Sequence, residues 1–217
     1  MRPAKNGGGA AKNGEPPNNR LAPKKLQSRE LPKMHPSGLV KARHERLRER
    51  YREVSEDAWI FDGARTVYNH DDDPFHGVVR AGEHDVGGMR FGIHRALGGD
   101  HDLPNPGDIL CAALAACLDA TLRMIADRLA VPIGFLEVSV TGELDARGPL
   151  RLEPSVPAGF QAMTCRVTLE PVGDVAEPQV AMLIAAAEQC CVVLNTLRNG
   201  VSVDARIERR AGALVGG

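Results

Sequence analysis

Residues 105–129 read NPGDILCAALAACLDATLRMIADRL, and this stretch decides the fold. Asn105 can cap the N-terminus of a helix, and Pro106 suits its first position. Asp108 completes a capping box and faces the positive end of the helix dipole. Residues 109–118 are apolar on all sides, which is typical of a buried helix. The stretch therefore predicts a long central helix, one face of which carries Leu114, Cys117, Thr121 and Met124.

Further segments on both sides of this helix have the patterns of regular structure. Residues 58–94 hold short apolar runs separated by turn residues, which predicts three or four short antiparallel strands. Residues 136–146 and 160–172 alternate apolar and polar side chains, which predicts two long strands. A second apolar helix is expected over residues 178–198, and a last strand over residues 201–207. The order predicts an α+β domain with antiparallel sheets around two long central helices.

The charges divide the chain of 217 residues near residue 50. Residues 1–50 carry 13 Lys and Arg against 4 Asp and Glu, whereas residues 51–217 carry 14 against 24. Residues 1–38 are rich in proline and glycine and contain no aromatic residue, a composition typical of disorder. We therefore predict a disordered basic N-terminal extension (1–50) and one domain (51–217), with residues 40–54 forming either a charged helix or the end of the extension.

The composition also limits partners and compartment. No apolar run reaches the roughly 18 residues of a membrane span, and the N-terminus has no apolar signal core, so we expect a cytoplasmic protein without membrane contact. The basic extension lacks aromatic residues for base stacking, so nucleic-acid binding is not expected. Residues 70–76 concentrate His and Asp, but proline breaks this loop, and we interpret it as solvated rather than as a metal site.

Five cysteines occur without a Cys-x-x-Cys pair, so neither a zinc ribbon nor a thioredoxin motif is indicated. Free cysteines are most often small buried hydrophobic residues, and a catalytic thiol is the alternative. We interpret Cys111 and Cys165 as core residues. Cys190 is interpreted either as a filler of an interface or as a thiol that competes with Cys191.

Two motifs resemble those of a known family. Residues 105–117 place Ala115-Ala116-Cys117 at the third turn of a Pro-led helix that follows Gly98-Gly99. Residues 191–197, Cys-Val-Val-Leu-Asn-Thr-Leu, are similar to a second motif, Cys-Pro-Val followed by Asn-Thr-Leu. In order and spacing these motifs resemble the OsmC/Ohr family of osmotically inducible and organic hydroperoxide resistance proteins, over about residues 58–209.

The resemblance implies an OsmC-like fold in an intertwined homodimer, and a thiol peroxidase that needs no metal or cofactor. It implies that Cys117 is the peroxidatic nucleophile and that Cys191, by its spacing to the Asn-Thr-Leu motif, resolves it. The activating arginine is expected from the early strands: Arg80 is the best candidate, with Arg90 and Arg95 as alternatives. The implied reductant is an external dithiol, of the lipoyl type or a lipoylated protein.

The residues also indicate the chemistry that such a site needs. A cysteine attacks a peroxide only as the thiolate, and Cys117 lies about 16 Å along the helix from Pro106, too far for the helix dipole to stabilise that anion. A cationic side chain is therefore required, and arginine suits it. Apolar side chains at Leu114, Val193 and Leu194 would favour an alkyl or fatty-acid hydroperoxide over hydrogen peroxide.

One departure from the family motivates an alternative function. The peroxide-resistance branch of the family has a glutamate that supports the arginine, and Gly107 stands at that position here. The alternative is an OsmC-like domain with little peroxidase activity that binds an apolar small molecule at the dimer interface.

Overall fold

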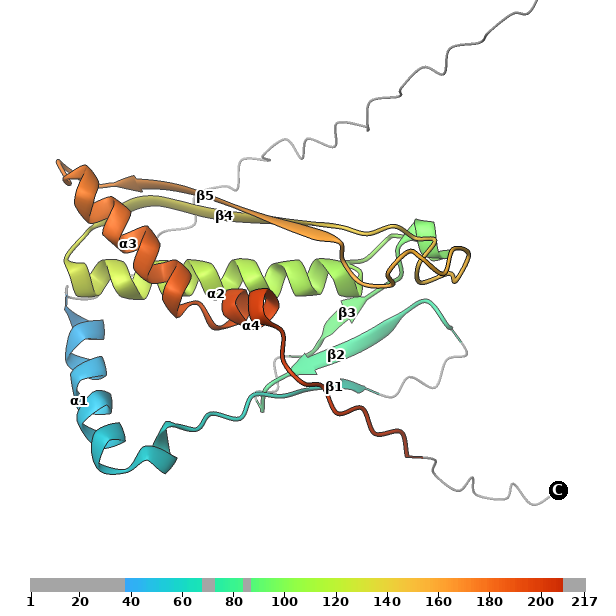
Figure 1. Cartoon of the computed structure of the whole chain (residues 1–217), viewed down its shortest axis with the longest axis horizontal. Helices are drawn as coiled ribbons and strands as arrows, with labels where there is room; N and C mark the ends of the chain where they lie inside the picture. The colour runs from blue at the N-terminus through green and yellow to red at the C-terminus, as the bar shows by residue number, and fades with distance from the viewer. Residues whose placement is uncertain (1–37, 68–72, 84–86, 209–217) are drawn as a thin grey trace, which may run out of the picture. The chain divides into compact units, whose positions relative to one another are not determined.

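The computed structural model describes residues 38–67, 73–83 and 87–208. Its helices are α1 (Leu39–Glu53), α2 (Pro106–Leu129), α3 (Glu177–Cys190) and α4 (Val192–Asn199), with short 3-10 helices η1 (Ser55–Ala58) and η2 (Arg95–Leu97) (Figure 1). Its strands are β1 (Ala64–Val67), β2 (Gly77–Ala81), β3 (Met89–Phe91), β4 (Ile133–Glu143) and β5 (Ala162–Pro171). The predicted α+β class with antiparallel sheets is confirmed.

The capping box at the start of α2 is present as predicted. The side-chain oxygen of Asn105 accepts hydrogen bonds from the backbone N–H groups of Gly107 (2.8 Å) and Asp108 (3.2 Å). In return, the carboxylate of Asp108 accepts from the backbone N–H of Asn105 at 2.9 Å. Both ends of the box satisfy groups that the helix itself leaves without a partner, so the sequence determines where α2 begins.

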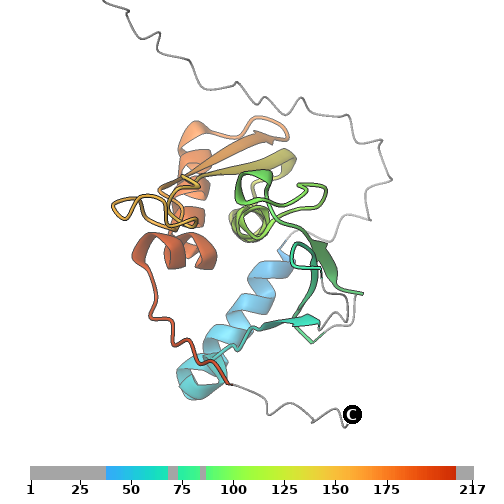
Figure 2. The same ribbon diagram turned by 90° about the vertical axis from the view of Figure 1, so that its right-hand side faces the viewer.

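Strands β4 and β5 form a long antiparallel hairpin that covers α2. Val138 pairs with Val167 and Val140 with Cys165, and the apolar side chains of both strands pack against the buried core. Figure 2, in which α2 is seen nearly end-on, shows the hairpin on one side of α2 and the pair α3–α4 on another. The alternation of the two sequences therefore gives one apolar face, which lies on the helix.

The core lies where these elements meet. Its buried apolar residues come from α2 from Leu114 onward, from the residues just after α2, from α3, from the α3–α4 junction and from the first turn of α4. They are Leu114, Leu118, Leu122, Ile125, Ala126, Val131, Leu183, Ala187, Cys191 and Leu194. Most are aliphatic, as expected from an aromatic content of 4%.

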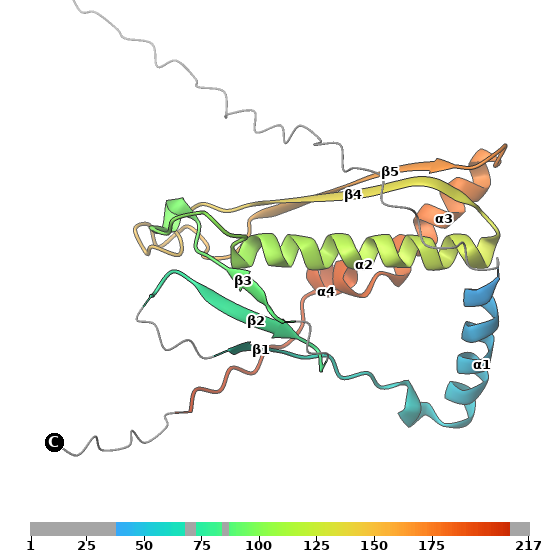
Figure 3. The ribbon, with the colours of Figure 1, turned by 180° about the vertical axis from the view of Figure 1, so that it is seen from behind.

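By length and composition α2 could cross a membrane, and it is the single unbroken helix of the described residues that could. Its leucines nevertheless lie in the core: Leu114, Leu118 and Leu122 are at most 4% exposed. Figure 3 shows α2 from the side that α3 and α4 do not cover. The exposed residues of the helix include Ala112, Ala113, Ala116, Ala120 and Met124, together with the charged Arg123. The helix thus has one face in the core of the single chain and a second apolar face that the described part of the chain leaves open.

Helix α1 joins the C-terminal end of α2 through Asp127. The Asp127 carboxylate accepts hydrogen bonds from the backbone N–H groups of Gly38 (3.0 Å) and Val40 (2.8 Å), so it caps α1 from another helix. Of the two alternatives for residues 40–54, a charged helix is therefore correct, and the predicted boundary at residue 50 falls within it. The predicted disorder of residues 1–37 lies outside the described residues.

Strands β1, β2 and β3 form a separate antiparallel sheet in that order. The sheet is joined to the start of α2 at Gly92, whose N–H donates to the carbonyl oxygen of Pro104 at 3.0 Å. Residues 59–61, one of the apolar runs in the predicted strand region, form no strand and are exposed. Of the three or four short strands predicted over residues 58–94, the described part of this region contains three.

Two predictions about the C-terminal part were wrong. The helix expected over residues 178–198 is broken at Cys191, where α3 and α4 meet with a bend of 61°. Residues 201–207 are extended but form no strand, because no described strand donates or accepts hydrogen bonds beside them. Val203 and Ile207 in this segment are 80% and 99% exposed.

Candidate functional site

The structure brings Cys117 and Cys191 together. Cys117 lies half-buried midway along α2, and Cys191 is fully buried at the junction of α3 and α4. Cys117 packs against the cluster that contains Cys191, and it is among the groups that raise the pKa of the Cys191 thiol. A pair of thiols in such contact can be joined by a disulfide with little movement of the chain.

The break between α3 and α4 positions Cys191 for this contact. Cys191 has an extended backbone (φ −70°, ψ 111°), although helical residues stand on both sides. The side-chain amide of Asn195 donates to the carbonyl oxygens of Glu188 (3.0 Å), Gln189 (3.2 Å) and Cys191 (2.8 Å). The Glu188 and Gln189 carbonyls lie at the end of α3, where the helix provides no partners, and the Cys191 carbonyl also accepts from the backbone N–H of Asn195 at 3.1 Å, so Asn195 stabilises the bend.

Thr121 is the third side chain at the pair. It lies one turn after Cys117, is 5% exposed, and is the one buried polar or charged residue of the described part of the chain. Its hydroxyl donates to the carbonyl oxygen of Cys117 at 2.7 Å. The same hydroxyl is among the groups that lower the pKa of the Cys191 thiol.

Some neighbours of Cys191 raise the pKa of its thiol and others lower it. Burial raises the pKa of the Cys191 thiol above its ordinary value, because the thiolate loses its hydration. The Leu194 N–H and the Thr121 hydroxyl lower the pKa, whereas contact with Cys117 raises it. The net direction is upward, so Cys191 is a protonated thiol at neutral pH.

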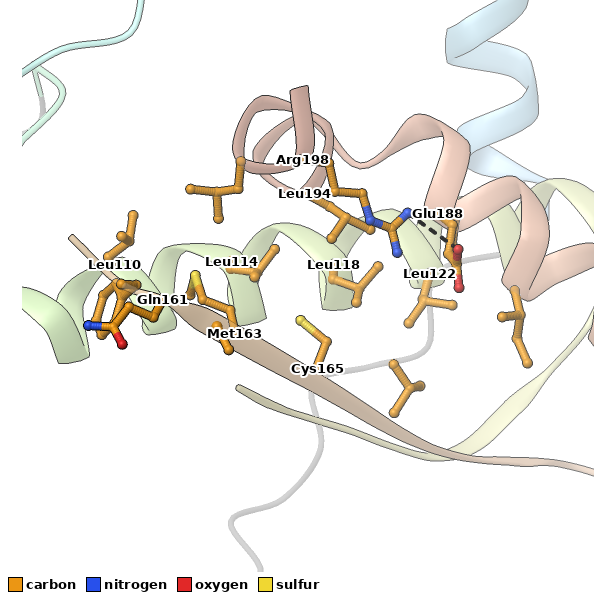
Figure 4. A pocket seen from close by; sticks show the side chains of 16 residues that line it. Leu110, Leu114, Leu118, Leu122, Gln161, Met163, Cys165, Glu188, Leu194 and Arg198 are labelled. Atoms are coloured by element: carbon orange, nitrogen blue, oxygen red, sulfur yellow. Dashed lines mark hydrogen bonds and ion pairs between the residues drawn. The ribbon is translucent and has the colours of Figure 1, made fainter. Parts of the chain in front are cut away.

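A groove of about 590 Å³ lies between α2, β5, α3 and α4, and neither Cys117 nor Cys191 is among its lining residues. Figure 4 shows Leu110, Leu114, Leu118 and Leu122 in a row along α2, with Met163 and Cys165 facing them from β5. Leu194 also lines the groove, and at one end Arg198 pairs with Glu188 at 3.4 Å. Leu114 and Leu194 of the predicted apolar wall therefore line a real cavity, whereas Val193 does not.

Cys190 is exposed, and together with Cys191, Asn195, Asn199 and Val201 it lines an open hollow of about 430 Å³ at the α3–α4 junction. The groups that act on Cys191 include Cys117 but not Cys190. This geometry favours Cys191 over Cys190 as the partner of Cys117.

The remaining two thiols lie farther along the hairpin and α2. Cys165 lines the groove, and burial raises its pKa while the charge of Arg198 lowers it. Burial also raises the pKa of Cys111, and the charges of Asp108 and Cys165 add to that rise. Both are therefore protonated, partly buried thiols, in keeping with their interpretation as core residues.

The three candidate arginines lie on the N-terminal sheet and just after it. Arg80 is half-buried on β2, opposite Arg65, while Arg90 on β3 and Arg95 in η2 are exposed. The pKa of Asp102 is lowered chiefly by His76, and the charge of Arg90 lowers it further. The pKa of His94 is lowered chiefly by burial, and the charge of Arg95 lowers it further. None of the three is among the groups that shift the pKa of Cys191. The described contacts thus bring the two cysteines together but do not add an arginine to them.

Gly107, which stands where the peroxide-resistance branch of the family has a glutamate, is tightly packed. A Cβ atom at this position would lie 3.0 Å from Cζ of Phe160 and 2.9 Å from the Asn105 side-chain oxygen. Asp108, the neighbouring carboxylate, is engaged in the capping box. Neither position therefore offers a carboxylate that is free to support an arginine.

Sequence reasoning named Cys117 and Cys191 but missed Asn195 and Thr121 as parts of the site. Thr121 carried a signal, since it is a polar residue on the apolar face that also holds Cys117. Asn195 stands in the second motif, but its three hydrogen bonds depend on a break that the sequence pattern does not indicate. Among the described residues, no group of three or more His, Cys, Asp and Glu is arranged to hold a metal ion.

Comparison with known proteins agrees with this geometry. Residues 99–206 match the family model described as OsmC-like protein. No curated protein has significant sequence similarity to the chain.

Solved structures with a similar fold include an OsmC-like protein from Mycoplasma pneumoniae, 18% identical, with a TM-score of 0.51; the match covers 65% of this chain and 89% of that protein. Another is an OsmC-like protein of unknown function from Vibrio cholerae, 11% identical, with a TM-score of 0.50, covering 64% and 94%. An organic hydroperoxide resistance protein from Elizabethkingia anophelis is 21% identical, with a TM-score of 0.48, covering 65% and 91%.

Proposed function

We propose, because this chain belongs to the OsmC/Ohr family, that it is a thiol-dependent peroxidase that reduces organic hydroperoxides. One observation carries the proposal: the half-buried thiol of Cys117 lies in contact with the fully buried thiol of Cys191. Such a pair can store the two oxidising equivalents of a peroxide as a disulfide. Cys117, the more exposed of the two, is the one that a substrate can reach first.

The reaction then has three steps. The Cys117 thiolate attacks one oxygen of the hydroperoxide, the O–O bond breaks, and an alcohol leaves as the sulfur becomes a sulfenic acid. The Cys191 sulfur attacks that sulfenic acid, an S–S bond forms, and the hydroxyl group leaves with the Cys191 proton as water. An external dithiol, of the lipoyl type or on a lipoylated protein, returns both cysteines to thiols and is itself oxidised to a disulfide. No resident cofactor or metal takes part.

The exposed apolar face of α2 supports a homodimer. Only 28% of the most apolar 18-residue stretch of α2 is buried within the single chain. Elsewhere the apolar residues Trp59, Phe61 and Ile207 are at least 75% exposed. A second copy that covers these surfaces would remove this apolar area from water. We infer that the dimer also completes the site, with Arg80 supplied across the interface to the Cys117 thiolate.

The leucine groove supports an organic hydroperoxide as substrate. A row of four leucines along α2 would contact an alkyl or fatty-acid chain, whereas hydrogen peroxide has no apolar part to fill the groove. The five cysteines are all free thiols, which fits a reducing compartment such as the cytoplasm.

The test is a single turnover followed by mass spectrometry. The reduced protein receives one equivalent of cumene hydroperoxide, and its intact mass and peptides are then measured. We expect a loss of two hydrogens and a Cys117–Cys191 disulfide. With dihydrolipoamide in excess, the steady-state rate should disappear in Cys117→Ser, while Cys111→Ser provides a matched thiol control on the same helix. Wild-type turnover in Cys117→Ser would contradict the proposal.

The groove also favours a second function, the binding of an apolar small molecule with little peroxidase activity. Its volume of about 590 Å³ falls in the range of ordinary ligand pockets. Calorimetric titration with dodecanoate and dodecanol distinguishes the two functions. Tight binding by the Cys117→Ser, Cys191→Ser double variant, together with no disulfide in the wild type after peroxide, would favour the binding protein.

A further inference from the structure

The leucine groove between α2, β5, α3 and α4 is mostly apolar but carries one ion pair. Of the residues that line it, Arg198 is the one cation and Glu188 the one carboxylate. Nη1 of Arg198 lies 3.4 Å from Oε2 of Glu188, and Figure 4 shows the two side chains pointing toward each other. A ligand that lies in the groove would therefore meet a single pair of opposite charges.

This ion pair is weak. The Arg198 and Glu188 side chains are 55% and 53% exposed, and water screens a pair that is so open. Their contact of 3.4 Å is longer than the roughly 2.7–2.9 Å of a good charge-assisted hydrogen bond. It also uses only one of the five N–H donors of the guanidinium. Arg198 can therefore bind a second carboxylate, or exchange Glu188 for it, at small cost.

The charge of Arg198, rather than that of Glu188, acts on the inside of the groove. Cys165 lines the groove from β5, and burial raises the pKa of its thiol while the charge of Arg198 lowers it. Glu188 is not among the groups that shift this pKa. The charge that the groove presents to its interior is thus positive, so the complementary head group is an anion rather than a cation.

The rest of the groove determines the other part of the ligand. Its leucines recur every four residues along α2, from Leu110 to Leu122, and at 1.5 Å per residue they form a row of about 18 Å. A long unbranched alkyl chain can lie along this row and remove its CH₂ groups from water. The complementary ligand is therefore an amphiphile with a long alkyl chain and one carboxylate.

We propose that Arg198 is a head-group site that selects carboxylated amphiphiles, the class of long-chain fatty acids, and that Glu188 competes with the ligand carboxylate for the guanidinium. This inference rests on the proposed occupation of the groove by an organic molecule. In the proposed peroxidase, the site would select hydroperoxides that carry a carboxylate over neutral ones. Neither Cys117 nor Cys191 lines the groove, so binding at Arg198 can be measured without turnover.

Calorimetric titration of the reduced full-length protein with dodecanoate and dodecanol tests the site, because these ligands share a chain and differ in the head group. We expect wild type to bind dodecanoate at least about tenfold more tightly than dodecanol, as for a hydrogen bond with a charged group. Arg198→Gln should abolish this preference. Glu188→Gln should increase it, because the competing carboxylate is gone. Arg166→Gln is the matched control and should keep the preference, since Arg166 lies on β5 but is exposed and does not line the groove.

Alkylation of Cys165 shows where the ligand lies. Dodecanoate should protect Cys165 from iodoacetamide at mildly alkaline pH, as read by peptide mass spectrometry. It should leave the rate at Cys190 unchanged, because Cys190 is exposed and lines a different hollow. In Arg198→Gln, the same concentration of dodecanoate should protect Cys165 less.

The outcomes separate the head-group site from the peroxidase. Equal affinity of wild type for dodecanoate and dodecanol would overturn the site, as would an equal loss of the preference in Arg166→Gln and Arg198→Gln. Unchanged alkylation of Cys165 in the presence of dodecanoate would also overturn it, because the ligand would then lie elsewhere. Cumene hydroperoxide carries no carboxylate, so a missing Cys117–Cys191 disulfide after its addition would contradict the peroxidase and leave the head-group site standing.

Discussion

The side-chain amide of Asn195 donates a 2.8 Å hydrogen bond to the carbonyl oxygen of Cys191, four residues earlier in the chain. The amide also reaches the carbonyls of Glu188 and Gln189, so a single side chain satisfies three acceptors at the end of α3. Asn195 thereby connects the bend of the backbone to the position of the buried thiol. Asn195 thus holds the backbone of Cys191, the proposed resolving cysteine, through its carbonyl oxygen.

Replacement of Asn195 should therefore affect stability and disulfide formation together. We expect Asn195→Ala to lower the free energy of unfolding by about 1–3 kcal/mol, because it leaves carbonyl groups without donors. Asn195→Asp should do more damage, since a carboxylate would face three carbonyl oxygens. Urea unfolding measures the first effect, and peptide mapping after peroxide measures the loss of the disulfide. Asn199→Ala, at the last residue of the same helix, is the control and should stay near wild type.

The identity of the resolving cysteine gives a second prediction. In Cys191→Ser, peroxide should leave Cys117 as a trappable sulfenic acid, because Cys117 acts on the thiol of Cys191, whereas Cys190 is exposed and is not among the groups that act there. Cys190→Ser should form the Cys117–Cys191 disulfide at the wild-type rate. A Cys117–Cys190 disulfide in the Cys191→Ser protein would show that the junction moves enough for either thiol to resolve.

The sequence predicts the parts of this fold that are determined locally. The capping box of Asn105 and Asp108 specifies the start of α2, and the alternation in residues 136–146 and 160–172 predicts the hairpin, because both signals lie within a few neighbouring residues. The start of α2 and the hairpin could be predicted without knowledge of distant contacts, whereas the pairing of Cys117 with Cys191 is what the resemblance of the two motifs to the family implies.

The parts that the sequence did not predict depend on distant contacts. Residues 190–194 read as a continuous apolar helix, since no Pro or Gly marks the break at Cys191; side-chain hydrogen bonds of Asn195 and burial of Cys191 decide it. Residues 201–207 alternate like a strand, but a strand exists only beside another strand, and the described part of the chain provides none there. The influence of Thr121 on the pKa of Cys191 joins α2 to the α3–α4 junction, and no local pattern can indicate such a relationship between distant residues.

The valine at position 192 gives a third prediction, since the family motif has proline there. Val192 is the first residue of α4, where a helix needs no N–H donor, and its side chain is 70% exposed. Cys191 before it already has the extended backbone that proline requires of its predecessor. Val192→Pro should therefore be tolerated and should raise the free energy of unfolding by about 0.4–1 kcal/mol, measured by urea unfolding. A clear loss of stability would mean that the Val192 N–H has a partner in the assembled protein.

A charged cluster at the base of the N-terminal sheet gives a fourth prediction, on pH. The ring of His76 lies 2.9 Å from Asp102 and 2.6 Å from Asp73, through its two nitrogens. The hydrogen bond with Asp102, followed by that with Asp73, raises the pKa of His76 above 6.5. The pKa of Asp102 is lowered below 3.8, chiefly by His76, and that of Asp73 is lowered by the Phe75 N–H and then by His76.

The direction of the pH effect follows from these shifts. A raised histidine pKa stabilises the fold fully below about 6.5, and the effect is lost as the pH rises through the folded pKa. A lowered aspartate pKa stabilises the fold above about 3.8, and the effect is lost as the pH falls. The difference in Tm between wild type and His76→Gln should therefore be largest between about pH 4 and 6.5 and should shrink on both sides. His44→Gln is the control: burial is the main cause that lowers the pKa of His44, so this variant should show no maximum in that range. A Tm difference for His76→Gln that does not change from pH 5 to pH 9 would mean that the His76 ring acts by packing rather than by charge.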